Sequence, residues 1–135
     1  MTGKITVGTI QDTNGNTVAS TYVTNGVAKA WSNFDGTGTI SIRDSLNIST
    51  LTDNGTGWYE TNFGSNFSNT NYNIVGFSRD ADASYATLSR LGISGASSGR
   101  GEKTTSLVEY VNPYTGDGNL YDTPEAGTTH HGDLA

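Results

Sequence analysis

Alternation of apolar and polar positions is the clearest pattern in this chain, and it predicts β-strands. Residues 39–48 show it best, because Ile40, Ile42, Leu46 and Ile48 share one parity while mostly polar residues occupy the other. Successive side chains of a strand point to opposite faces. This segment is therefore expected to be one strand with a buried face and a solvated face.

Asn-Gly pairs punctuate the alternating runs and predict hairpins. The run over 5–11 meets Asn-Gly at 14–15, which indicates a two-residue type I′ turn, and a second strand is expected over 17–27. A further reversal is expected at 52–57, before an aromatic strand over 58–63. Additional strands are predicted at 71–78, 84–91 and 105–111. The polar stretches 92–103 and 113–129 are expected to be surface loops.

No segment has a convincing helical period, so the chain is predicted to be all-β. Several short strands separated by turn residues favour a β-sandwich or jelly-roll-like domain. We place this domain at 28–135 and assign 1–27 as a β-rich N-terminal segment for attachment or trimerisation.

The composition argues against a hydrophobic core that one copy of the chain completes by itself. The 135 residues fit one domain, but only 33% are hydrophobic, against a usual share of about 45–50%. The chain nevertheless holds two Trp, seven Tyr and four Phe, mostly in alternating runs, which argues against disorder. We therefore expect an ordered β-protein whose core is completed by other copies of the chain.

Charge and cysteine content exclude several classes of function. A net charge of −6 disfavours nucleic acid and anionic membranes as partners. No apolar run approaches the roughly 20 residues of a membrane span, and the first residues lack the basic and apolar regions of a signal peptide. Without cysteine, stability must come from strand pairing and packing. Synthesis in a cytosol is expected.

The acidic residues offer weak candidates for catalysis. Hydrolysis of a glycan needs two carboxylates roughly 5–10 Å apart, and the candidates are Asp35, Asp44, Asp53 and Glu60. Asp44 falls on the apolar parity of its strand, so a bulge or a charged partner is favoured there over catalysis. No nucleophile triad or phosphate-binding loop is present, and we predict neither an enzyme, nor a catalytic residue, nor a cofactor.

His130 and His131 are weak candidates for a metal site. Neighbouring strand residues point to opposite faces, so one chain could not easily direct both at one ion. Three copies of one histidine around a symmetry axis could share a metal, but a polar chain end is the favoured interpretation. The calcium-like spacings at 80–84 and 117–122 are interpreted as turns.

The stretch "AKAWSNFDGTGTISIRDSLNISTLTDNGTGWYETNF" resembles a segment that recurs in tail fibre and other virion structural proteins of bacteriophages. The pattern runs Lys-Ala-Trp, Phe, Gly-Thr-Gly-Thr, an Ile-Arg strand, and Asp-Asn-Gly-Thr-Gly before an aromatic strand. It covers about residues 28–79, and the final "GDLA" is also similar. The residues that carry it are Trp31, Phe34, Gly36, Gly38, Arg43, Asp53, Asn54, Gly55 and Gly57. The "TTHH" before the end departs from the aromatic or aliphatic strand of that family.

The resemblance implies a phage virion protein, a tail fibre or receptor-binding module that forms an intertwined homotrimer on the particle surface. Core or interface positions would be Trp31, Phe34, Ile40, Ile42, Leu46, Trp58 and Phe63. The expected partners are further copies of the chain, other virion proteins through 1–27, and a glycan or protein on the host surface.

Receptor contact would fall to tyrosines and amides of the later loops, since tyrosine offers a rigid apolar plate with a polar tip. The candidates are Tyr110, Asn112, Tyr114, Asn119 and Tyr121. Packing of the last strands is the competing interpretation of the tyrosines. An architectural capsid decoration, head fibre or collar protein is the alternative function, and a glycan depolymerase is disfavoured.

Overall fold

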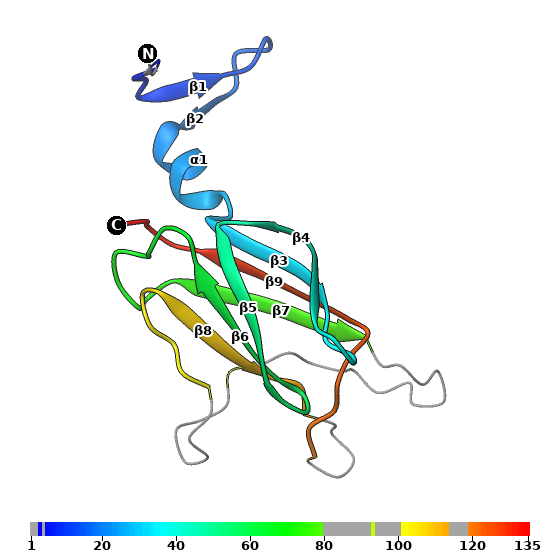
Figure 1. Cartoon of the computed structure of the whole chain (residues 1–135). Helices are drawn as coiled ribbons and strands as arrows, with labels where there is room; N and C mark the ends of the chain where they lie inside the picture. Colours follow the sequence, from blue (N-terminus) through cyan, green and yellow to red (C-terminus); the bar gives the residue numbers. More distant parts are fainter. Residues whose placement is uncertain (1–2, 4, 80–92, 94–100, 114–118) are drawn as a thin grey trace.

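The computed structural model describes residues 3, 5–79, 93, 101–113 and 119–135 (Figure 1). Apart from one short helix, α1, the regular elements of these residues are strands. They are β1 (Thr9–Gln11), β2 (Thr17–Ala19), α1 (Ser20–Gly26), β3 (Ala30–Asp35), β4 (Ser41–Leu46), β5 (Ile48–Gly55), β6 (Trp58–Phe63), β7 (Asn73–Arg79), β8 (Leu107–Val111) and β9 (Glu125–His131). The predicted all-β character is confirmed.

Antiparallel pairing organises the strands into three sheets. The order β4-β3-β9-β7 forms a four-stranded sheet, β5-β6-β8 a three-stranded sheet, and β1-β2 a separate hairpin. The strands predicted at 58–63, 71–78 and 105–111 are confirmed as β6, β7 and β8. The strand predicted at 84–91 lies outside the described residues.

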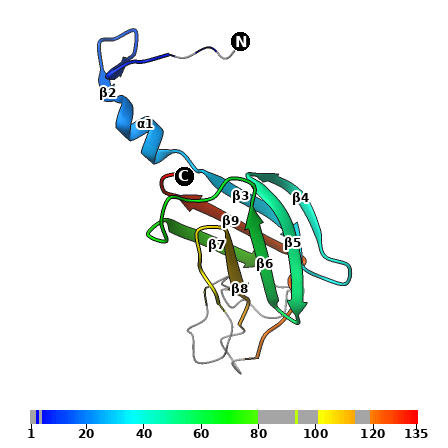
Figure 2. The ribbon, with the colours of Figure 1, turned by 60° about the vertical axis from the view of Figure 1, so that its left-hand side comes forward.

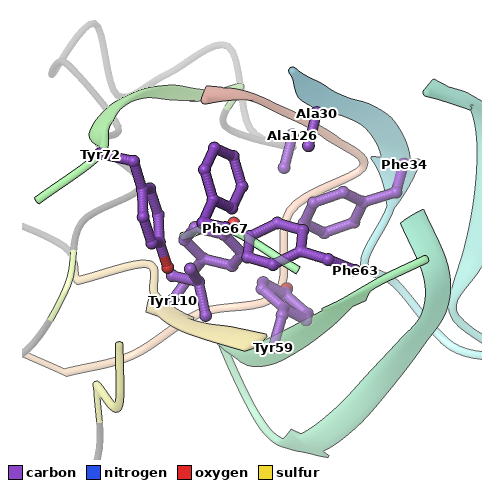
Figure 3. Close-up of a cluster of buried hydrophobic side chains, with 9 residues drawn as sticks. Ala30, Phe34, Tyr59, Phe63, Phe67, Tyr72, Tyr110 and Ala126 are labelled. Carbon is purple, nitrogen blue, oxygen red and sulfur yellow. The ribbon is translucent and has the colours of Figure 1, made fainter. Parts of the chain in front are cut away.

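An aromatic cluster fills the space between the four-stranded and three-stranded sheets (Figure 3). Its members are Ala30, Phe34, Tyr59, Phe63, Phe67, Tyr72, Val108, Tyr110 and Ala126. Rings from the two sheets meet edge to face, with centroids 5.2 Å apart for Phe34 and Tyr59. Large rings bury much apolar area per residue, so a few of them hold together a chain that is poor in aliphatic side chains.

A corner at Asn47 divides the segment that the alternation predicts as one strand. β4 ends at Leu46 and pairs with β3, whereas β5 begins at Ile48 and pairs with β6 in the other sheet. Asn47 has φ 56°, and its amide bonds both Ser65 N, at 2.6 Å, and Ser65 O, at 3.0 Å. Asparagine tolerates this left-handed conformation better than most residues, so the chain can cross between sheets here.

A β-bulge in β4 explains why the predicted buried face is wrong. Asn33 pairs with Asp44 but Phe34 pairs with Ile42, which leaves Arg43 as the extra residue. The bulge reverses the parity of the strand, so Ile42 lies on the core side and Leu46 on the opposite face. Both are at a sheet edge, with exposures of 38% and 48%. Of the two arrangements expected at Asp44, a charged partner or a bulge, the structure has the bulge.

The second expected strand, over 17–27, is wrong beyond Ala19. β1 pairs only as far as Thr9 with Ala19, and Ser20 N donates to Gly8 O. Past this point the described chain offers no neighbouring strand, so the backbone forms local helical bonds in α1. The hairpin itself is confirmed, but its turn spans 12–16 and only Gly15 of the Asn-Gly pair has positive φ, 88°.

β9 occupies 125–131, part of which was expected to be a loop. Its sequence EAGTTHH contains no large aliphatic residue, yet it pairs with β3 on one side and β7 on the other. Small side chains suit this central position because aromatic rings pack against it. An ideal Cβ at Gly127 would lie 2.3 Å from a ring carbon of Phe77.

Candidate functional site

A chain of polar side chains crosses the core between β6, β8 and β9. The Tyr110 hydroxyl lies 2.6 Å from His130 Nε2 and 3.0 Å from Thr61 Oγ1. His130 Nδ1 lies 3.2 Å from the carbonyl oxygen of Ala30. Tyr110, His130 and Thr61 are each at most 1% exposed. Figure 3 shows Tyr110 directed into the aromatic cluster.

The partners of this network assign its protons. A carbonyl oxygen can only accept, so His130 Nδ1 donates to Ala30 and neutral Nε2 accepts from the Tyr110 hydroxyl. The Tyr110 oxygen then accepts from Thr61. Burial lowers the pKa of His130 from 6.5 to about 4 and raises that of Tyr110. Both groups are held neutral, and the network ties the two sheets together.

The structure corrects the expectation that Tyr110 and Asn112 contact a receptor. Tyr110 is 1% exposed because its ring packs in the core, and Asn112 is 6% exposed. The Asn112 amide donates to Tyr121 O at 2.7 Å, while Ser78 Oγ donates to its oxygen at 2.6 Å. Asn112 therefore holds the chain before β9 against β7 instead of facing solvent.

The remaining receptor candidates have different positions. Asn119 is exposed, and Tyr121 is 47% exposed. Pro113 and Leu120 form an isolated antiparallel bridge that places this segment beside the end of β8. Tyr114 lies outside the described residues. Asn119 and Tyr121 are therefore the two predicted contact residues that the structure places at the surface.

His130 and His131 point to opposite faces, as their adjacency in a strand predicts. Both ring nitrogens of His130 have partners inside the core. The half-buried His131 has Nδ1 3.2 Å from Gly26 O, at the end of α1. Over the residues with described positions, no group of three metal-ligating side chains comes together. The polar chain end expected here is corrected for His130, which is fully buried.

The four candidate carboxylates take part in local structure. Asp35 accepts from Thr37 and forms an ion pair with Arg43 at 3.1 Å, and its pKa is lowered chiefly by the Thr37 hydroxyl. Asp44 accepts from Ser45 N, Asp53 from Gly55 N, and Glu60 from the Asn62 amide. These bonds stabilise turns and strand surfaces.

The residues that carry the phage-like pattern lie in β3, β4 and β5, except Gly36, Gly38 and Gly57, which lie between strands. An ideal Cβ at Gly36 would lie 2.4 Å from the Tyr59 hydroxyl, and one at Gly57 would lie 2.6 Å from Tyr121 N. Arg43 Nη2 bonds Asp35 and also the carbonyl oxygen of Pro124, at 2.6 Å. The final GDLA is bound to the segment before β7, since Ala135 N donates to Asn66 O. Residues of the pattern therefore stand at points where separate segments of the chain pack closely together or are joined by hydrogen bonds.

Among the predicted core or interface residues, Phe34 and Phe63 lie in the aromatic cluster, at 0% and 6% exposure. Ile40 packs against the cluster, and Trp31 and Trp58 are half-buried. Ile42 and Leu46 are exposed on the edge strand β4. The predicted set therefore divides into residues inside the core and residues at the surface of a single chain.

The N-terminal segment 5–27, which we call the lead-in, contains no buried residue. It comprises β1, β2 and α1, and it extends away from the two larger sheets (Figure 2). Apolar side chains are exposed along it, including Ile5 at 89% and Tyr22 at 75%. A two-stranded hairpin and a seven-residue helix have little stability by themselves. The apolar side chains of the lead-in are therefore uncovered in the single chain.

Comparison of the chain with protein-family models, with curated proteins and with solved structures found no match. A search of the described residues for a helix long and apolar enough to cross a membrane found none.

Proposed function

We propose that this chain is a structural protein of a bacteriophage virion that assembles as a homotrimer in a tail fibre or receptor-binding module. The observation that carries the proposal is the lead-in, in which every residue from 5 to 27 is exposed or only half-buried. Such a segment gains order by contact with other chains. A virion component needs this kind of contact, both with its own copies and with the protein to which it is attached.

We interpret the body of the chain, residues 28–135, as a β-sandwich. Support comes from the aromatic cluster shared by the two larger sheets and from the Tyr110–His130 bond between β8 and β9. The crossing of the chain at Asn47 from one sheet to the other agrees with this interpretation. Residues 1–27 would then attach the sandwich to another virion protein or to the other subunits.

The phage assignment is supported by the sequence pattern and by the positions of its residues. Gly36 and Gly57 stand where a side chain would collide with Tyr59 or with the backbone of Tyr121. Arg43 joins the bulge of β4 to the carbonyl oxygen just before β9. The order and spacing of the pattern therefore match requirements of the framework, as expected for a virion structural protein.

Competition for host adsorption tests the receptor-binding function. Purified protein at saturating concentration should reduce adsorption of the corresponding phage to its host cells. A variant with Asn119→Ala and Tyr121→Ser should compete less well, because these substitutions remove the exposed amide and ring. Thr50→Ala, at an exposed position of β5 outside the lead-in, is the control. Absence of competition by the wild-type protein would contradict receptor binding.

An architectural protein of the capsid or collar is a second candidate function. The burial of Tyr110 and Asn112 favours it, because these two residues cannot contact a host receptor. Antibody labelling of intact particles, viewed by electron microscopy, separates the alternatives. Label at the tail tip supports attachment, whereas label over the capsid or collar supports the architectural function.

A further inference from the structure

The four-stranded sheet has an apolar patch on the face turned away from the aromatic cluster. Trp31 pairs with Leu46 on one side and with Thr129 on the other, and Thr129 pairs with Val75. Phe77 lies in the next row, opposite Gly127. Because alternate residues of these strands point into the core, these side chains point outward. We call Leu46, Trp31, Val75 and Phe77 the outer patch.

The outer patch is open in the single chain. Leu46 is 48% exposed, Val75 60% and Phe77 51%, while Trp31 is half-buried. An ideal Cβ at Gly127 would lie 2.3 Å from the Phe77 ring, so the ring lies close against the backbone of β9.

Charge makes this face more suitable than others for contact between identical chains. The chain carries a net charge of −6, so two copies repel each other over most of their surfaces. At one end of the patch the charges are paired within the chain, Arg43 with Asp35 at 3.1 Å and Arg79 with Glu125 at 3.7 Å. Asp44 on the edge strand adds one negative charge. The face is nearly neutral, which lowers the electrostatic cost of self-association.

We infer that the outer patch is covered by a second copy of this chain. This inference deepens the proposed homotrimer and rests on it, because it names the surface through which the copies would pack. A sheet face of this size offers about 400 Å² from its strand spacing and rise. A standard interface buries about 800 Å² on each partner. The sheet face alone is therefore too small.

The lead-in supplies the remaining apolar surface. It joins the sheet at the start of β3, and His131 Nδ1, on the outward face of β9, lies 3.2 Å from Gly26 O at the end of α1. Val23 and Val27 of the lead-in, on either side of Gly26, are themselves 38% and 48% exposed. A neighbouring copy that contacted both the outer patch and these side chains would bury more apolar surface than the sheet face alone offers.

Thiol protection tests the inference directly, because the chain has no cysteine of its own. We would compare a Val75→Cys variant with a Thr52→Cys variant, whose site is exposed on β5 of the other sheet. The reagent is a polyethylene glycol maleimide, and the mass in solution is followed by light scattering. At concentrations where the protein is multimeric, the thiol at position 75 should react at least tenfold more slowly than that at position 52. Dilution to the monomer should abolish the difference.

Each outcome has a distinct meaning. Equal reaction rates in a multimeric protein would overturn the inference and leave the homotrimer standing, since the copies would then associate through another surface. A wild-type mass of 14.2 kDa at every concentration would overturn both. Protection of position 75 only after addition of another virion protein or a host glycan would assign the outer patch to that partner and also overturn the inference.

A charged double variant provides an independent test. Leu46→Lys with Val75→Lys should raise the dissociation constant between copies by about a hundredfold or more, since each lysine would be desolvated in the contact. Thr50→Lys with Thr52→Lys, at exposed positions of β5, is the control and should leave the constant within about threefold. An unchanged constant in the first variant would contradict the inference. If that variant fails to fold, the thiol comparison decides.

Discussion

The hydroxyl of Tyr110 lies 2.6 Å from Nε2 of His130 and joins β8 of one sheet to β9 of the other. The sequence offers Tyr110 as a candidate receptor contact, with packing of the last strands as the competing interpretation, and it places His130 in a polar chain end. Their mutual burial instead produces a hydrogen bond in a region of low dielectric constant, where an unpaired polar atom is costly.

Removal of the Tyr110 hydroxyl should destabilise the protein. Tyr110→Phe leaves His130 Nε2 and the Thr61 hydroxyl without their buried partner, at a cost of about 1–3 kcal/mol in the free energy of unfolding. Tyr22→Phe makes the same change at a side chain 75% exposed and should cost less than about 0.5 kcal/mol. Urea unfolding at one protein concentration measures both. Equal effects of the two substitutions would show that the buried bond contributes nothing.

Stability should fall as the pH is lowered from about 6.5 to about 4. Burial lowers the pKa of His130 from 6.5 to about 4, so in this window the unfolded chain binds a proton that the folded chain does not. The loss amounts to about 3 kcal/mol at the acid end. The free energy of unfolding, measured in steps of pH, should show this slope.

A histidine substitution separates this slope from other titrations. His130→Asn should remove most of it, whereas His131→Asn should retain it, because that substitution leaves His130 buried. The lowered pKa of Asp35 affects stability only at lower pH, below its ordinary value of 3.8. The same slope in wild type and in the His130 variant would contradict the prediction.

Two glycines with similar backbone angles should respond differently to alanine. Gly57 has φ 60°, and a Cβ there would lie 2.6 Å from Tyr121 N and 2.7 Å from Tyr121 O. Gly38 has φ 57° with open space around it. We expect Gly38→Ala to cost about 1 kcal/mol from conformation alone, and Gly57→Ala to cost at least about 2 kcal/mol more because backbone must move. Thermal unfolding compares them, and a similar loss at both sites would refute the close approach to Tyr121.

Substitution of Asn47 should lower the free energy of unfolding through both its backbone conformation and its side-chain bonds. Asn47→Gly keeps the left-handed conformation and removes the two bonds to Ser65, whereas Asn47→Ala also strains the backbone at φ 56°. We expect losses of about 1 and about 2 kcal/mol respectively. Denaturant midpoints give the order, and an alanine variant as stable as the glycine variant would exclude a contribution from backbone strain.

Local sequence patterns were sufficient to predict several of the strands and turns. The stretch TDNGTG at 52–57 and the aromatic alternation after it predict the β5–β6 reversal, which the structure has between Gly55 and Trp58. Turn conformation and strand pleat depend on neighbouring residues. β9 could not be found in this way. Its sequence EAGTTHH lacks an apolar alternation, and it becomes a strand because β3 and β7 bond it from both sides.

The burial of the candidate site residues likewise could not be predicted from local sequence. The sequence identified tyrosines and amides but had no signal for which of them are covered, so Tyr110 and Asn112 were grouped with Asn119 and Tyr121. Likewise Val75 and Phe77 lie in a correctly predicted strand, yet only the pairing with β9 shows that they point away from the core.

The sequence by itself determined the all-β character and the approximate positions of the hairpin reversals, because these depend on residues close together along the chain. Only the tertiary structure decided that the chain changes sheet at Asn47, that His130 is buried beside Tyr110, and that Leu46 lies at the surface. These features depend on contacts between segments up to about a hundred residues apart, such as His130 with Ala30. A pattern of polar and apolar residues states which side chains favour burial, but the partners that bury them are set by the packing of the whole chain.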